Sequence, residues 1–282
     1  MIVTRFAPSP TGYLHLGHAL AAVTAHEAAH GGRFLLRIED LDPGRSREEF
    51  VEAIYEDLRW LGLAWQEPVL RQSSRMSHYR AALDRLDGEG LLYPCFCTRS
   101  EIAAEIAGSV EAPHGPEGML YPGTCRHLSR DRRAALINSG GRYALRLDSG
   151  KAAARLPPLW FEDGGINPYR EHTLIEVNPC LFGDVVLARK EMPAAYHLAV
   201  VVDDAEQGVA LVTRGRDLLA ATHVQRVLQA LLGFPAPRYA HHHLIVDERG
   251  RKLSKRENAM TLRSFRLHGV GPEDIRARLL HR

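Results

Sequence analysis

Apolar and polar positions alternate in a regular order through the first 62 residues of the chain. Ile2–Ala7 and Phe34–Glu39 have the length and composition of strands. Leu16–His30 is rich in alanine, carries leucines at helical spacing and ends at two glycines, which predicts a helix. A second helix is expected at Ser46–Trp60. It begins with a capping box in which Ser46 is the N-cap and Glu49, three residues later, is its partner. This order of elements predicts an α/β fold with a parallel sheet and right-handed crossovers.

The later part of the chain returns to the same kind of pattern. Leu198–Val202 predicts a buried strand that Asp203–Asp204 ends in a turn. Val209–Val212 is the next apolar stretch, and a helix is expected from about His223 to Leu232. Leu244–Val246 predicts a last strand. These elements extend the parallel sheet of the first part.

Residues 93–190 interrupt this order because they are rich in glycine, proline and arginine and lack a strand–helix rhythm. We interpret them as an insertion that connects two halves of one nucleotide-binding domain. The predicted division is therefore a first half at 1–92, an insertion at 93–190, a second half at 191–260, and a short helical C-terminal segment at 261–282.

The composition indicates an ordinary globular protein, with 45% hydrophobic and 25% charged residues and a net charge of +2. RNA binding would therefore depend on local basic patches such as Arg126–Arg133 or Arg249–Arg256. No apolar stretch approaches the roughly 20 residues that span a bilayer, and no basic and apolar leader precedes the first strand. The four cysteines do not form a secreted disulfide framework. We expect a cytoplasmic protein without a membrane partner.

Two features far apart in the chain carry the groups of an ATP site. His15 and His18 flank Gly17 where the first helix begins, and a helix N-terminus offers unpaired amides and partial positive charge. A basic loop downstream contains Lys252 and Lys255, whose ammonium groups can stabilise pyrophosphate as it leaves. A histidine pair alone is commonly a surface feature, and a basic cluster alone is commonly a solvated turn. Their joint occurrence predicts a single nucleotide site.

These two features resemble the signatures of class I aminoacyl-tRNA synthetases. His15–His18 is similar to the HIGH signature, and Lys252–Arg256 is similar to KMSKS, with Leu253 in place of methionine and arginine in place of the last serine. The resemblance implies a Rossmann-type parallel sheet split by a connective insertion. It also implies ATP as a substrate, accompanied by Mg²⁺. In that reading His15, His18 and Lys255 are catalytic, and Gly17 and Lys252 help to bind ATP.

Three other stretches resemble the glutamyl branch of this class: Arg5–Gly12, Arg37–Asp42 and Arg214–Leu218. Only residues 257–282 follow the basic loop, which we expect to be too few for an anticodon-binding domain. The chain is thus similar to the glutamyl-queuosine tRNA(Asp) synthetases, a truncated family. That family activates glutamate with ATP and moves it to the queuosine base in the anticodon of tRNA(Asp). The resemblance implies L-glutamate, ATP and queuosine-bearing tRNA(Asp) as partners, and we expect a monomer.

A glutamate site needs cations for two carboxylates, an anion for one ammonium, and hydroxyl groups. Arg5 and Arg214 are candidates for bidentate carboxylate clamps. Glu39 ends a predicted strand, where such folds bind ligands, and can accept the ammonium. Ser9 and Tyr196 supply hydroxyls, and the resemblance assigns all five residues to the glutamate pocket. Without the resemblance, Glu39 reads as an acidic turn or metal ligand and Tyr196 as core.

Three cysteines of the insertion predict a structural zinc site: Cys95, Cys97 and Cys125. Spacing alone leaves His114 and His127 open as the fourth ligand, whereas the resemblance implies Tyr121 through its Tyr-x3-Cys element, and we choose Tyr121. Cys180 stands apart and is expected in the core. The run His241–His243 is assigned no role, because adjacent strand residues point to opposite faces.

Three other functions stay open at this point. A truncated glutamyl-tRNA synthetase would charge tRNA(Glu) at its terminal adenosine. An ATP-dependent cysteine or pantoate ligase uses similar signatures but lacks the Arg5–Gly12 segment and the Tyr-x3-Cys element. A non-catalytic zinc- and RNA-binding paralogue would not need His15, His18 and Lys255, all of which this chain retains.

Overall fold

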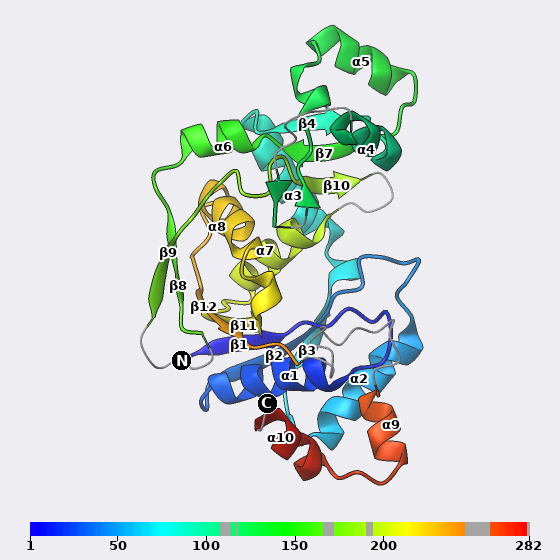
Figure 1. Cartoon of the computed structure of the whole chain (residues 1–282), viewed down its shortest axis with the longest axis vertical. Helices are drawn as coiled ribbons and strands as arrows, with labels where there is room; N and C mark the ends of the chain where they lie inside the picture. The colour runs from blue at the N-terminus through cyan, green and yellow to red at the C-terminus, as the bar shows by residue number, and fades with distance from the viewer. Residues whose placement is uncertain (108–113, 117, 166–171, 190–193, 246–259, 281–282) are drawn as a thin grey trace.

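A computed structural model describes residues 1–107, 114–116, 118–165, 172–189, 194–245 and 260–280. Figure 1 shows an α/β body that contains both ends of the chain. Residues from the middle of the chain extend away from this body, toward the top of the view. None of the helices in these ranges is long and apolar enough to cross a membrane.

The first part of the body contains, in chain order, β1 (Val3–Phe6), α1 (Leu16–Ala28), β2 (Arg33–Ile38), α2 (Glu48–Trp60), β3 (Gln66–Arg71), the 3₁₀ helix η1 (Gln72–Ser74) and α3 (Met76–Gly88). β2 lies between β1 and β3 and pairs with both in parallel. The predicted strands, helices and parallel pairing of this part are confirmed.

The later part of the body contains α7 (Tyr196–Glu206), β11 (Leu211–Gly215), the 3₁₀ helix η3 (Arg216–Leu218), α8 (Ala221–Leu231) and β12 (Arg238–His242). β11 and β12 pair in parallel. The Ala210 amide donates to the Val3 carbonyl at 3.0 Å, which brings β11 beside β1. The helix predicted from His223 is confirmed by α8.

Three predictions about this body are wrong. Leu198–Val202 forms part of α7 rather than a strand, because the helix is buried along these residues and so shows no amphipathic period. The Asp203–Asp204 pair lies buried in that helix rather than in a turn. The strand near residue 244 is β12 instead, and its buried histidines look polar in the sequence. Val246 lies outside the described residues.

The predicted capping box is also wrong. Arg47, not Ser46, is the N-cap of α2, and its side chain makes no capping hydrogen bond. Glu49 is therefore the second residue of the helix, one position short of the third position that a capping box uses. The Arg47 amide donates instead to the Pro10 carbonyl at 3.0 Å, which fixes the helix entry to the loop after β1.

Helices cover both faces of the sheet. On β2, Leu35 packs in one core cluster with residues of α3, α7 and α8, whereas Phe34 and Leu36 pack in another with residues of α1 and α2. This alternation is the period of two that places successive strand residues on opposite faces. Since both faces are buried, β2 reads as a continuous apolar run in the sequence.

The middle of the chain contains β4 (Leu92–Cys95), α4 (Arg99–Ala107), β5 (His114–Gly115), β6 (Gly118–Met119), the 3₁₀ helix η2 (Thr124–His127), α5 (Arg130–Asn138), β7 (Ala144–Leu147), α6 (Ser149–Arg155), β8 (Trp160–Asp163), β9 (Thr173–Glu176) and β10 (Val186–Arg189). β4, β7 and β10 form an antiparallel sheet. β8 is not part of that sheet. It pairs in parallel with β12 of the later part of the body, with Asp163 opposite Tyr239. The middle segment thus supplies a strand to the later half of the body.

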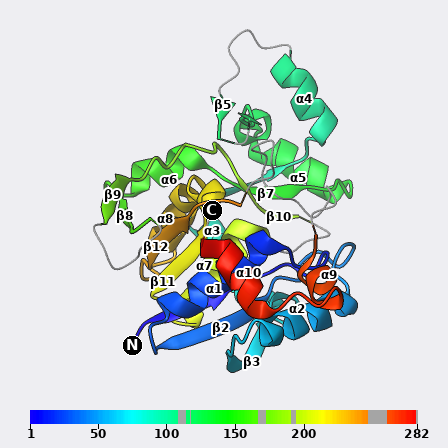
Figure 2. The same ribbon diagram turned by 60° about the horizontal axis from the view of Figure 1, so that its bottom comes forward.

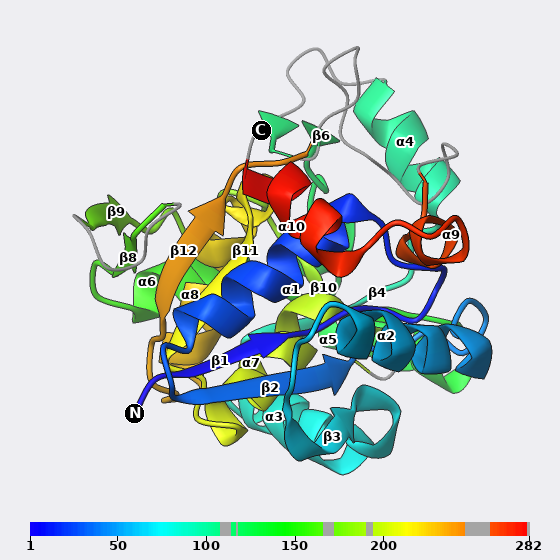
Figure 3. The ribbon, with the colours of Figure 1, turned by 90° about the horizontal axis from the view of Figure 1, so that it is seen from below.

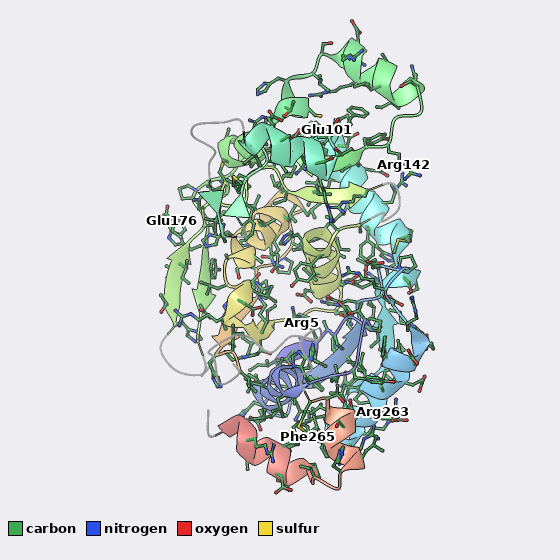
Figure 4. The ribbon with its side chains drawn as sticks, turned by 45° about the vertical axis from the view of Figure 1, so that its right-hand side comes forward. Arg5, Glu101, Arg142, Glu176, Arg263 and Phe265 are labelled. Carbon is green, nitrogen blue, oxygen red and sulfur yellow. The ribbon has the colours of Figure 1, made fainter. Side chains whose placement is uncertain are left out.

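Two short helices, α9 (Leu262–Leu267) and α10 (Pro272–Leu280), form the C-terminal segment. They lie over α1 and α2 in two views (Figures 2 and 3). Phe265 of α9 is buried in the core cluster of those helices (Figure 4). Arg266 of α9 donates to Glu56 at 2.9 Å and to Asp57 at 3.2 Å, which ties the segment to α2.

Candidate active site

A cavity of about 680 Å³ opens where the carboxyl ends of β1, β2 and β11 meet, the place at which α/β sheets bind ligands. Figure 4 labels Arg5 of β1, one of the residues that line this cavity. Eight residues predicted from the sequence line it: Arg5, Ser9, His15, Gly17, His18, Glu39, Tyr196 and Arg214. Lys252 and Lys255 lie outside the described residues.

The two signature histidines cap α1. His15 is the N-cap, and its Nδ1 accepts from the Gly17 amide at 3.1 Å. His18 Nδ1 accepts in turn from the His15 amide at 3.1 Å. Because Nδ1 is the acceptor in both rings, each neutral imidazole carries its proton on Nε2. The first turn therefore supplies two ring N–H donors beside a helix N-terminus, an arrangement suited to phosphate.

Glycine between these histidines avoids a tight contact with the His15 ring. A Cβ at Gly17 would lie 3.0 Å from His15 Cε1, closer than carbon atoms normally approach. The two imidazole ring centroids are only 3.8 Å apart, so neither ring has room to give way easily. Gly17 thus gives space to the His15 ring, in addition to the close approach of a nucleotide predicted from the sequence.

Arg5 reaches the cavity from β1 with part of its charge already compensated. Its Nε and Nη2 donate to the two carboxylate oxygens of Asp204 at 3.0 and 3.3 Å. Arg37 Nη1 donates to the same carboxylate at 2.7 Å. Burial tends to raise the pKa of Asp204, but Arg5 and then Arg37 outweigh it and hold that pKa below its usual value. Asp204 is therefore an anion shared by two guanidinium groups.

Glu39 is an anionic group of the cavity, which Asp217 also lines. Its side chain is 10% exposed and lies 3.3 Å from Arg37 Nη2. Burial raises the pKa of Glu39, partly offset by Arg37 and Arg5, so a cationic ligand group would stabilise its ionised form. Ser9 and Tyr196 also line the cavity, and both are exposed. Tyr196 is the first residue of α7.

Arg214 of β11 is 5% exposed and also lines the cavity. Its three guanidinium nitrogens donate to uncharged groups of β12 and α8. Nε donates to His241 Nε2 at 3.1 Å, Nη1 to Gln225 Oε1 at 2.8 Å, and Nη2 to Thr222 Oγ1 at 2.6 Å. Among the described residues, no carboxylate lies within ion-pair distance of Arg214, in contrast to Arg5.

The predicted metal ligands lie together in the middle segment, away from this cavity. The ligand atoms of three thiols are all within 4.8 Å of one another: Cys95, Cys97 and Cys125. Tyr121 Oη is 3.6 Å from Cys97 Sγ and accepts from the Cys125 amide at 2.9 Å. Burial raises the pKa of Cys97 to about 12.

The remaining candidates fit this cluster less well. His127 is exposed and is not part of the group, and the side chain of His114 is not described. Cys180 is exposed, so its expected place in the core is wrong. Its thiol donates weakly to the Ser149 carbonyl at 3.7 Å, outside the zinc cluster. The residues present thus fit a site of three thiolates that Tyr121 completes.

Sequence reasoning missed the residues that hold the two arginines. Asp204 was expected in a turn, and Thr222, Gln225 and Asp163 carried no pattern of their own. His241 belonged to a noted histidine run, but the alternation rule only separated it from its neighbours. Its contact with Arg214 depends on the parallel pairing of β11 and β12, which sets Arg214 opposite His241.

Sequence comparison finds relatives across almost the whole chain. Residues 1–281 match the family described as "tRNA synthetases class I (E and Q), catalytic domain". A protein of Rhodobacter capsulatus named glutamyl-Q tRNA(Asp) synthetase is 49% identical, with 98% of each chain covered. A Deinococcus radiodurans protein of the same name is 45% identical and is covered over 89% of its length. A glutamate–tRNA ligase of Aquifex aeolicus is 40% identical, with 97% of this chain and 55% of the ligase covered.

Solved structures give the same picture. The crystal structure of the glutamate–tRNA synthetase from Elizabethkingia anophelis matches with a TM-score of 0.73 at 29% identity. The match covers 90% of this chain and 52% of the other. A glutamate–tRNA ligase from Elizabethkingia meningosepticum, solved in complex with its amino acid, matches with a TM-score of 0.72, also at 29% identity.

Proposed function

Since the chain belongs to the class I tRNA synthetases (E and Q), we propose that it is a ligase that activates L-glutamate with ATP and transfers it to queuosine in tRNA(Asp). The relatives named glutamyl-Q tRNA(Asp) synthetase support this substrate because they align over most of their own length. The glutamate–tRNA ligase from Aquifex aeolicus aligns over little more than half of its length.

One observation carries the choice of amino acid. The cavity brings two guanidinium groups, from Arg5 and Arg214, together with the carboxylate of Glu39, and Asp217 also lines it. The guanidinium groups can bind the two carboxylates of glutamate, and Glu39 can bind its ammonium group. Glutamine would leave one guanidinium facing a neutral amide, and enzyme sites reject such a ligand strongly.

In the first step, the glutamate α-carboxylate attacks the α-phosphorus of ATP. A carboxyl oxygen–phosphorus bond forms, the bond between the α-phosphorus and the bridging oxygen breaks, and pyrophosphate leaves. Mg²⁺ bound to the triphosphate would help to neutralise its charge. The Nε2–H groups of His15 and His18 stabilise charge on the phosphate, and removal of one such donor typically lowers the rate about 10²- to 10³-fold. Lys252 and Lys255 bind ATP, with Lys255 stabilising the leaving group.

In the second step, a nucleophile of the queuosine base attacks the carbonyl of the mixed anhydride and AMP leaves. A tRNA substrate favours the cytoplasm as the compartment of this protein. We also expect the protein to be a monomer. Cys95, Cys97, Tyr121 and Cys125 would hold one Zn²⁺ in the middle segment. A closed tetrahedral zinc site of this kind stabilises a fold and takes no part in bond making.

Exchange of labelled pyrophosphate into ATP, without tRNA, tests the first step. We expect exchange that depends on glutamate, and its loss in His18→Ala. Absence of glutamate-dependent exchange in the unaltered protein would contradict the proposal and would favour a non-catalytic RNA-binding paralogue. Exchange followed by charging of tRNA(Glu) would favour the alternative that the Aquifex aeolicus relative suggests.

A further inference from the structure

The two arginines of the cavity are held by opposite kinds of partner. Arg5 donates twice to the carboxylate of Asp204, so part of its charge is used inside the protein. Arg214 donates to an imidazole, an amide and a hydroxyl, none of which carries negative charge. A buried guanidinium without an anion is costly, and a ligand carboxylate removes that cost on binding.

Each nitrogen of Arg214 has one neutral acceptor. α8 supplies Thr222 and Gln225, three residues apart on one face, and β12 supplies His241. A guanidinium has five N–H groups, so these three hydrogen bonds leave one N–H on Nη1 and one on Nη2. These two donors remain for a ligand carboxylate.

The acceptor role of His241 is favoured by a carboxylate from a distant part of the chain. Since Nε2 accepts from Arg214, the ring proton lies on Nδ1, which is 3.2 Å from Asp163 Oδ1. This contact is electrostatic, because its geometry is not that of a hydrogen bond. The same carboxylate oxygen accepts from the His241 amide at 3.0 Å. Asp163 ends β8, which reaches the body only through its pairing with β12. Burial lowers the pKa of His241 despite Asp163, which keeps the ring neutral at pH 7.

We propose that Thr222, Gln225 and His241 form a neutral cradle that orients Arg214 without neutralising it, and that Asp163 holds His241 in the accepting tautomer. The four are positioning residues that set the affinity of the cavity for an anionic amino acid. This inference rests on the proposed function. A carboxylate in the cradle would compete with the ligand for Arg214, because it would form an ion pair with the guanidinium in the unliganded protein.

The sharpest test adds a charge to the cradle without removing a hydrogen bond. Gln225→Glu keeps an acceptor for Arg214 and the shape of the side chain. We expect the dissociation constant for glutamate, measured by calorimetry without ATP or tRNA, to rise at least about 10-fold. ATP affinity and melting temperature should stay near those of the unaltered protein. A purely structural role for Gln225 predicts unchanged glutamate affinity.

Gln229→Glu is the matched control. Gln229 lies one turn further along α8 and accepts from Arg226, which does not line the cavity. The same chemical change there should leave glutamate affinity within about 2-fold. Equal losses in both variants would overturn the cradle, as would tight glutamate binding by Gln225→Glu.

A second pair of variants tests His241. His241→Gln retains an acceptor for Arg214, whereas His241→Leu removes it at similar size. We expect His241→Leu to weaken glutamate binding about 10-fold or more and His241→Gln to restore most of the affinity. Equal affinity in the two variants would overturn the role given to His241.

Binding and catalysis separate the two proposals. In one outcome the unaltered protein binds glutamate, Gln225→Glu weakens that binding, and the unaltered protein transfers no glutamate to tRNA. This outcome would support the cradle and contradict the proposed reaction. Active protein whose affinity ignores Gln225→Glu would support the reaction and contradict the cradle. Protein that does not bind glutamate at all would contradict both.

Discussion

At the scale of single residues, the site uses buried charge to distinguish ligands. Within the described part of the chain Arg214 has only neutral partners, and the pKa of Glu39 is raised chiefly by burial. A ligand group of opposite charge stabilises the charged form of each side chain, because the ion pair offsets the free energy lost on desolvation. A neutral side-chain amide offers Arg214 only a hydrogen bond. Discrimination between glutamate and glutamine should therefore depend on the arginine.

Replacement of Arg214 tests this reading. In the unaltered protein, kcat/KM for pyrophosphate exchange should be on the order of 10³ or more higher with glutamate than with glutamine. Arg214→Gln should reduce that ratio to within about 10-fold, mainly by loss of activity with glutamate. The KM for ATP serves as the internal control. A ratio that survives the substitution would contradict the role of Arg214.

At the scale of elements, α7 connects the two halves of the body through two adjacent carboxylates. Asp203 accepts from Arg75 at 2.7 Å and from Tyr79 at 2.8 Å, both on the α3 side. Asp204 accepts from Arg5 of β1 and Arg37 of β2. Two adjacent carboxylates of one helix thus pair with three arginines from the first part of the chain.

Loss of one of these carboxylates should destabilise the whole body. Asp204→Asn leaves Arg5 and Arg37 buried without their shared anion, so the free energy of unfolding in urea should fall by about 3–5 kcal/mol. Glu206→Gln is the control, because Glu206 also pairs with Arg75 but its side chain is 47% exposed. That change should cost less than about 1 kcal/mol. Similar losses in the two variants would contradict the argument.

The contact between α2 and α9 contains an unfavourable charge. Burial raises the pKa of Asp57 to about 6, with Arg266 opposing the rise. A folded pKa above the unfolded value means that this group lowers stability as pH rises from about 4 through 6. Asp57→Asn should therefore raise the free energy of unfolding by about 1–2 kcal/mol at pH 7.5 and change it little at pH 4. A loss of stability at pH 7.5 would contradict this assignment.

At the scale of the whole molecule, the middle segment has a core of its own around the thiol cluster. Cys95 and Cys125 are buried there with Tyr93, and Tyr121 packs against them. The same segment sends β8 back to the body, where Asp163 meets His241. Loss of order in this segment would therefore affect the amino acid site through β8, which carries Asp163 to its contact with His241.

Metal analysis tests the zinc assignment. The purified chain should contain about one zinc per molecule, since a closed structural site takes four ligands. Cys95→Ser should lose the metal, and Cys180→Ser, which alters an exposed thiol outside the cluster, should keep it. Full zinc content in Cys95→Ser would contradict the site.

Periodicity was enough to predict β1, α1, β2 and α2, because each of them follows one local pattern, whereas β3 and α3 were not predicted. It failed for α7, whose apolar run is buried and shows no period. The cavity residues followed from the signatures. The partners of Arg214 did not, because β8, α8 and β12 bring Asp163, Gln225 and His241 together only after strand pairing.

Transfer of labelled glutamate to purified tRNA measures the central claim most directly. Three substrates are compared in the presence of ATP: tRNA(Asp) with queuosine, tRNA(Asp) without it, and tRNA(Glu). Label should appear on the first alone. Label on tRNA(Glu), or on tRNA(Asp) regardless of queuosine, would contradict the proposed function.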